Sequence, residues 1–187
     1  MDRPELLKTI CVKIGKAETE ALAALSADNK LPVSELLDLS FQRQQEIAFR
    51  AGWILETIAI KYPGAFKPLV SDFLNRYAHQ RNTSCQRHFT KIMMCLTDPE
   101  YSDRVQVSSC FDAGPIIETT FEWLIDPKTP VAVQVNCMDV LFNLKDTLPW
   151  ISAELQSQVV FLLHAGSPAL QSRGKAILKK LSKSTKS

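Results

Sequence analysis

The sequence has few glycines and no long apolar run, and these absences exclude several classes of protein. Six glycines among 187 residues, scattered along the chain, disfavour a fold built from strands and tight loops. No apolar run reaches the roughly 18 residues that a membrane-spanning helix needs. The first residues, MDRPELLKTICVKIG, lack the basic region and the apolar core of a signal peptide. We therefore expect a cytoplasmic protein that makes no contact with a membrane.

The short motifs of the common enzyme classes are also missing. The chain has no G-x-S-x-G turn to expose a nucleophilic serine and no glycine-rich loop to cradle a phosphate. Its cysteines are odd in number, widely spaced and without a C-x-x-C pair: Cys11, Cys85, Cys95, Cys110 and Cys137. This pattern indicates free thiols in a reducing compartment, packed as small apolar residues. We expect no cofactor, and a non-enzymatic protein is favoured over an enzyme with catalytic residues dispersed along the chain.

A metal site is the sharpest chemical alternative, because His79, Cys85, His88 and Cys95 lie close together in the sequence. On a helix that starts near Thr83, His88 and Cys95 are about 10 Å apart along the axis. Cys85 and His88 are neighbours on such a helix, but two ligands do not make a tetrahedral zinc site. We therefore expect no metal.

What the sequence does contain is a helical spacing of apolar residues. Apolar residues make up 45% of the chain and charged residues 22%, as in soluble globular proteins. Within 44–62, one predicted helical face is formed by Ile47, Ala51, Ile54, Leu55, Ile58 and Tyr62. A second stripe of Phe49, Trp53 and Ile60 lies roughly opposite, so we expect this helix to be packed between neighbours on both sides.

Turns and caps separate the helical segments. Proline and glycine at 63–64 end the first helix described above. Thr83 and Gln86 have the spacing of a capping box at the start of another helix. Thr129 and Pro130 are typical of an N-cap followed by the first helical residue. We therefore predict a chain of helices joined by short turns.

The apolar pattern recurs along the chain. With an offset of 86 residues, the apolar positions of 47–63 fall on those of 133–149. An intermediate copy is formed by Phe89, Ile92, Met93 and Leu96. The mean period of about 43 residues lies in the range of HEAT and armadillo repeats. We predict an all-α fold, an α-α superhelix of stacked antiparallel helical hairpins.

Three segments carry a closer resemblance: FRAGWILETIAIKYPGAFKPLVSDFLNRY, TSCQRHFTKIMMCL and WLIDPKTPVAVQVNCMDVLFNL. They resemble a group of small bacterial HEAT-like proteins of unassigned function. The resemblance implies a HEAT-like solenoid and no particular reaction. We expect a single domain, 1–187, with these parts: N-terminal capping helices 1–42, repeats 43–81, 82–126 (with an irregular insertion) and 127–165, a C-terminal capping helix 166–183 and a frayed tail 184–187.

The second helices of HEAT hairpins usually line the concave side. By this resemblance, the candidate partner-binding residues are Lys67, Ser71, Asn75, Glu118, Glu122 and Gln156, with Ser152 beside them. The row is mixed to acidic, whereas a duplex groove, as in the HEAT-like DNA alkylation-repair glycosylases, needs many cations facing phosphates. We therefore favour a non-enzymatic binding or scaffold protein for a protein or peptide partner.

Nucleic-acid association is the alternative, because charge is unevenly distributed. Residues 47–97 hold seven Lys or Arg against two Asp or Glu, 98–129 hold two against seven, and 165–187 hold six against none. The candidate anion-binding cluster is Arg76, Arg81, Arg87, His88 and Lys91, with His79 nearby. The same charges also fit a solvated face that binds nothing.

Overall fold

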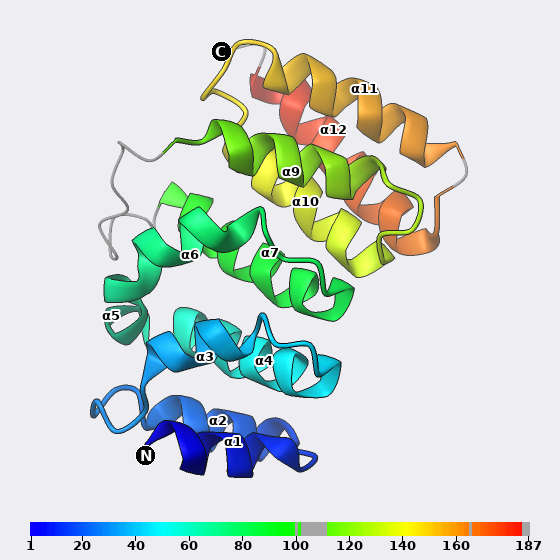
Figure 1. Ribbon diagram of the computed structural model, residues 1–187. Helices are drawn as coiled ribbons and strands as arrows, with labels where there is room; N and C mark the ends of the chain where they lie inside the picture. The colour runs from blue at the N-terminus through cyan, green and yellow to red at the C-terminus, as the bar shows by residue number, and fades with distance from the viewer. Residues whose placement is uncertain (100, 102–111, 165, 185–187) are drawn as a thin grey trace. The chain divides into compact units, whose positions relative to one another are not determined.

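The computed structural model describes residues 1–99, 101, 112–164 and 166–184. Within these ranges every regular element is a helix and none is a strand, which confirms the predicted all-α fold (Figure 1). The elements are α1 (Arg3–Cys11), α2 (Lys16–Ala24), α3 (Val33–Leu39), α4 (Gln45–Lys61), α5 (Pro63–Phe66), the 3₁₀ turn η1 (Lys67–Leu69), α6 (Val70–Tyr77), α7 (Thr83–Thr97), α9 (Gly114–Ile125), α10 (Val131–Asn143), α11 (Ile151–Leu163) and α12 (Pro168–Ser184).

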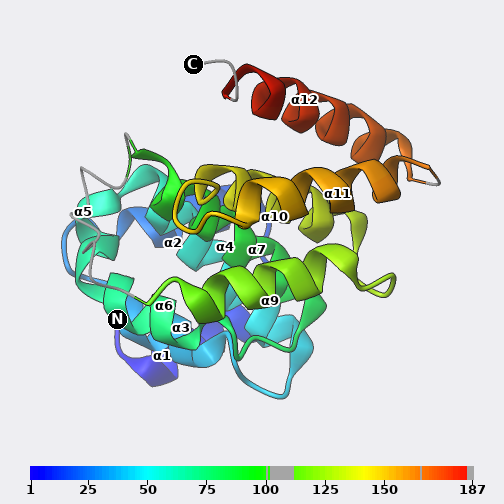
Figure 2. The same cartoon turned by 90° about the horizontal axis from the view of Figure 1, so that it is seen from above.

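The chain divides into two compact units, Met1–Phe111 and Asp112–Ser187. In the first unit, α1, α3 and α6 lie in one layer and α2, α4 and α7 in the other (Figures 1 and 2). Helix α4 is the centre of its layer, because α2 packs on one of its sides and α7 on the other. In the second unit, α10 packs against both α9 and α12, and α11 packs against α12.

Each central helix packs against several others. Helix α4 packs against α7, α2 and α3, α10 packs against α9 and α12, and α11 packs against α12 and, less extensively, against α10. The predicted repeats, which start at residues 43, 82 and 127, begin with α4, α7 and α10, and their bounds stay a prediction. A sequence period gives the length of a repeat and not the turn at which it begins. The single domain, the terminal caps and the tail stay predictions, and much of the predicted insertion lies outside the described residues.

Most positions that align in the sequence repeat are core positions, although Phe49 and Val135, which also align, are half-buried. The buried side chains are Ile47, Ala51, Ile54, Leu55 and Ile58 on α4, Phe89, Ile92, Met93 and Leu96 on α7, and Val133, Cys137, Val140, Leu141 and Leu144 in the copy at α10. The two layers of the first unit meet at aromatic side chains. The ring centroid of Phe73 on α6 lies 4.9 Å from that of Phe89 on α7. The repeat therefore records which side of each helix faces the core.

The second apolar stripe of α4 is not buried as predicted. Phe49 and Trp53 are half-buried, and Ile60 is 46% exposed. Helices α2, α3 and α7 pack against α4, and His88 of α7 contacts Phe49 on the side of the second stripe. The prediction that both sides of this helix are covered therefore fails only in part, at the exposed Ile60.

Two predicted helix starts are shifted by one residue. Asn82, not Thr83, caps α7, and its side-chain oxygen accepts hydrogen bonds from the first-turn backbone. Gln86 consequently takes no part in a capping box, and its side chain donates to the Gln80 carbonyl. Helix α10 begins at Val131, and the extended backbone of Pro130 places it in the cap position that Thr129 was expected to hold. Asparagine caps as well as threonine because both offer a short side-chain oxygen.

The two isoleucines of α4 that differ in burial provide a test of this packing. Replacing Ile58→Ala removes a fully buried side chain and is expected to lower the free energy of unfolding by about 2–5 kcal/mol. Replacing Ile60→Ala removes an exposed side chain and should change it by no more than about 0.5 kcal/mol. Urea denaturation of both variants measures the difference, and equal losses would contradict the described orientation of α4.

Candidate functional site

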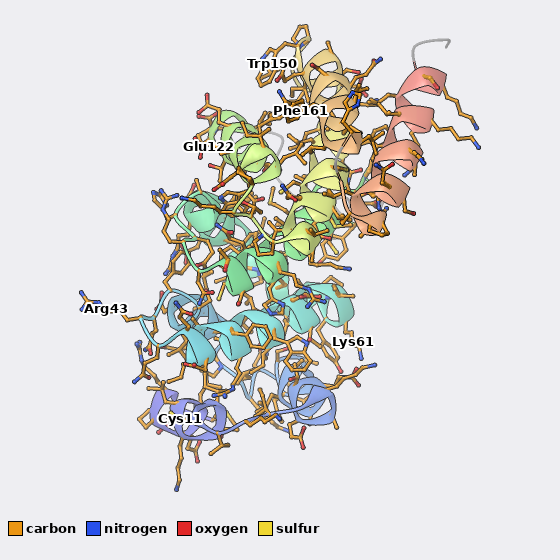
Figure 3. All side chains as sticks on the ribbon, turned by 90° about the vertical axis from the view of Figure 1, so that its right-hand side faces the viewer. Cys11, Arg43, Lys61, Glu122, Trp150 and Phe161 are labelled. Carbon is orange, nitrogen blue, oxygen red and sulfur yellow. The ribbon has the colours of Figure 1, made fainter. Side chains whose placement is uncertain are left out.

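A pocket lies between α2 and α4, within the first unit. Its volume is about 160 Å³. The residues that line it are Lys16, Thr19 and Glu20 from α2 and Trp53, Glu56, Thr57, Ile60 and Lys61 from α4. Figure 3 shows Lys61 on α4 at this side of the unit. The open stripe of α4 therefore forms one wall of the pocket.

Helical spacing brings these side chains together. On α4, Trp53, Glu56 and Ile60 are three and four residues apart, so they lie on the same side of the helix. On α2, Lys16 and Glu20 are separated by one turn in the same way. The packing of α2 on α4 then sets one row opposite the other.

The rim of the pocket carries an ion-paired group of three charges. Nζ of Lys61 lies 2.9 Å from Oε1 of Glu20, and Nζ of Lys16 lies 4.0 Å from the same atom. The hydrogen bond from Lys61 and its positive charge hold the pKa of Glu20 below its usual value. Both lysines are solvent-exposed, so salt screens these interactions and the rim contributes little to stability.

Glu56 is held differently, by a buried histidine of α7. Nδ1 of His88 lies 2.5 Å from Oε2 of Glu56, and the two side chains are 4% and 19% exposed, respectively. The His88 ring also contacts Phe49, with ring centroids 4.9 Å apart. His88 also lies close to Gly52, where an added Cβ would be 3.4 Å from Cδ2 of the ring. The carboxylate is thus fixed in orientation at the inner wall of the pocket.

The geometry of this pair suits binding better than catalysis. A histidine oriented by a carboxylate can act as a base through its second nitrogen. Nε2 of His88, however, is buried and has no hydrogen-bond partner among the described residues, so it does not reach the pocket. Burial raises the pKa of the nearby Cys95 thiol, and the charge of Glu56 raises it further. Cys95 therefore stays protonated at neutral pH and is a poor nucleophile.

The six residues predicted to bind a partner are all exposed, but they fall into two groups. Lys67, Ser71 and Asn75 lie on η1 and α6 of the first unit. Glu118, Glu122 and Gln156 lie on α9 and α11 of the second unit, and Figure 3 labels Glu122. Ser152 is half-buried. None of these residues lines the pocket between α2 and α4.

The predicted anion-binding cluster is reduced by pairing and burial. Nη1 of Arg76 donates to Oδ1 of Asp38 at 2.6 Å, and its guanidinium carbon lies 4.4 Å from the centroid of the Phe41 ring. His88 is buried and faces Glu56, so it is not part of an anion-binding surface. The other members do reach the surface, since Arg81 and Arg87 are exposed and Lys91 is half-buried.

The residues weighed as metal ligands are also separated. His79 is exposed, Cys85 and His88 are buried, and Cys95 is half-buried. In the part of the chain that the structure describes, no three His, Cys, Asp or Glu side chains are grouped so that they could hold a metal ion.

The pocket could not be predicted from the sequence, because its two walls are far apart in the chain. Glu20 and Lys61 meet across α2 and α4 although 41 positions separate them. One signal was visible: Glu56 is one of only two acidic residues in 47–97. A lone carboxylate between apolar residues on a helix indicates either a specific partner or a functional site.

Comparison with known proteins gives the class of protein to which these paired helices belong. The family model described as HEAT repeat domain matches residues 6–181. The chain therefore belongs to the HEAT repeat family, as its sequence resemblance implied. The comparisons with curated proteins and with solved structures gave no match. Among the described residues, no helix combines the length and the apolar character needed to cross a membrane.

The packing predicts which thiols react in the native protein. Cys11 is exposed, while Cys85 and Cys137 are buried. Burial raises the pKa of Cys85 to about 12 and raises the pKa of Cys137 as well, so both stay protonated at pH 8. Iodoacetamide at pH 8 should alkylate Cys11 roughly a hundredfold faster than the two buried thiols. Peptide mass spectrometry measures the rates, and in denaturant all three should react. Fast alkylation of native Cys85 would contradict the packing of α4 on α7.

Proposed function

We propose that this HEAT repeat protein is a non-enzymatic binding module that holds a segment of a partner protein against α2 and α4. The observation that carries the proposal is the half-buried Trp53 beside the exposed Ile60, both lining a pocket that ends at an oriented carboxylate. Large apolar side chains at a surface, rimmed by charges, are typical of protein interaction sites.

The composition of this surface is that of an interaction hot spot. Tryptophan is among the residues most often found at the energetic centre of protein interfaces. Trp53 is held by its neighbours, since its ring centroid lies 6.0 Å from that of Phe49. A rigid aromatic ring loses little side-chain entropy when a partner covers it. The Trp53 ring is therefore already oriented for binding in the absence of a partner.

The size of the pocket favours one side chain of a larger partner over a free cofactor. Pockets for drug-sized ligands occupy about 300–1,000 Å³, whereas this one has about 160 Å³. A polypeptide segment can place a single residue in the pocket and cover the stripe with its neighbours. The layered packing of α2, α4 and α7 offers an extended surface for the rest of such a segment.

The residues predicted from the sequence form a second candidate surface, separate from the pocket. Lys67, Ser71 and Asn75 are exposed on the opposite layer of the first unit. Only short polar side chains and one lysine are offered there, so it lacks the apolar anchor that Trp53 supplies. We therefore place the main partner contact at the pocket.

Nucleic-acid association has weaker support. Beyond Arg81 and Arg87, the clearest cationic row is Lys175, Lys179 and Lys183, which are exposed at successive turns of α12. A protein that makes about 6–10 phosphate contacts binds duplex DNA with a steep salt dependence. Three lysines on one helix provide much less, and they fit a solvated face.

A peptide selection tests the proposed function. A random twelve-residue display library is selected on the wild-type protein, and the enriched peptides are measured by fluorescence polarisation. Replacing Trp53→Ala is expected to weaken their binding by at least about tenfold, since truncation of a hot-spot residue costs about 2 kcal/mol or more.

The control is Trp150→Ala, because Trp150 is a tryptophan that reaches the surface but belongs to the second unit. This variant should bind the peptides as the wild type does. Peptides that bind both variants equally well, or a library from which none is enriched, would contradict a binding role for the pocket between α2 and α4.

A further inference from the structure

We infer that the pocket between α2 and α4 takes the guanidinium group of an arginine side chain, supplied by the partner segment. This inference rests on the proposed function and names the chemistry of the residue that enters the pocket. The observations that lead to it are the carboxylate at the inner wall, the position of Trp53 and the pairing of the rim lysines.

The inner wall of the pocket presents a carboxylate without a cationic side chain of its own. Oε2 of Glu56 lies 2.5 Å from Nδ1 of His88, and the carboxylate also lines the pocket. Among the described residues, no lysine or arginine forms an ion pair with Glu56, and the adjacent Lys61 is paired with Glu20. A mostly buried carboxylate is stabilised by a cation far more than an exposed one is. The pocket thus offers a carboxylate with which no lysine or arginine of the described chain is paired.

Trp53 determines which cation fits best. It lies three residues before Glu56 on the same side of α4, so one ligand group can meet both side chains. A guanidinium is planar, stacks on an aromatic face and can donate two parallel hydrogen bonds to a carboxylate. The ammonium of lysine is a more strongly hydrated point charge that cannot stack in this way. The apolar side chain of Ile60, which also lines the pocket, matches the methylene stem of an arginine.

The two lysines at the rim do not reverse this preference. Both lie near Oε1 of Glu20, and both are exposed to solvent. Their repulsion of a cation is therefore screened by water and salt. Glu56 is more deeply placed, and its attraction is screened less. The inner carboxylate consequently decides the sign of the ligand.

Small arginine derivatives test this inference without knowledge of the partner. Nα-acetyl-arginine methylamide is titrated into ¹⁵N-labelled protein, and the indole resonance of Trp53, assigned with Trp53→Phe, reports binding. The control ligand is the citrulline derivative, in which a neutral urea of the same shape replaces the guanidinium. We expect the arginine derivative to bind with a millimolar dissociation constant and the citrulline and lysine derivatives to bind about tenfold more weakly.

Two variants locate the effect. Replacing Glu56→Gln keeps an oxygen that can accept from His88 but removes the charge, and it should weaken binding of the arginine derivative about tenfold. Replacing Glu46→Gln changes an exposed glutamate in the first turn of the same helix and should leave binding unchanged. Because the comparison of ligands uses the wild-type protein, the test does not depend on the folding of any variant.

Equal binding of the arginine and citrulline derivatives would overturn the inference, and so would tighter binding of the lysine derivative or of acetate. Failure of this inference can be distinguished from failure of the proposed function. If selected peptides require Trp53 but contain no arginine that they need, the binding module stands and the guanidinium assignment fails. If neither the peptides nor the derivatives depend on Trp53, both fail.

Discussion

The packing of α4 is the constraint on which the first unit depends. This helix buries one broad apolar face against α2, α3 and α7, and fully buried side chains such as Ile54, Leu55 and Ile58 fill that contact. A helical hairpin cannot bury such a face alone, so neighbouring pairs must stack. The opposite side of α4 is apolar as well, and it is only partly covered: Phe49 contacts His88 of α7, whereas Ile60 is exposed. The surface that we propose as a binding site is therefore the part of α4 that its core contacts leave accessible.

The helical content, the repeat period and the core residues could all be predicted from the sequence. Apolar spacing is a local property, and it correctly placed residues such as Ala51, Phe89 and Cys137 in the interior. The packing of α3 against α4 could not be predicted in this way, because a period gives the length of a repeat and not which helices are in contact. The exposure of Ile60 was missed for a related reason. Two apolar stripes on one helix show that both can be buried, but the number of neighbours decides which one is.

The candidate site depends on pairings between residues that are distant in the sequence. His88 looked like one cation of a basic cluster, yet it faces Glu56 across α4 and α7. Arg76 similarly forms an ion pair with Asp38 on α3. A sequence shows the sign of each charge but not its partner, and the partner decides whether a charge is available to a ligand. Once these pairings are known, Glu56 differs from the other charged residues of the pocket. The rim lysines are paired with Glu20, whereas the side chain that contacts Glu56 is a histidine.

Solvent accessibility of the α4 side chains tests the central claim most directly. A soluble gadolinium chelate relaxes the NMR signals of exposed groups, and it can be applied to isoleucine methyl groups and the Trp53 indole in one experiment. The account predicts strong relaxation of the Ile60 methyl group, intermediate relaxation of the Trp53 indole and little effect on Ile54 and Ile58. If Ile60 and Trp53 were as protected as Ile58, the second stripe would be packed against a neighbour, and the proposed binding surface would not exist.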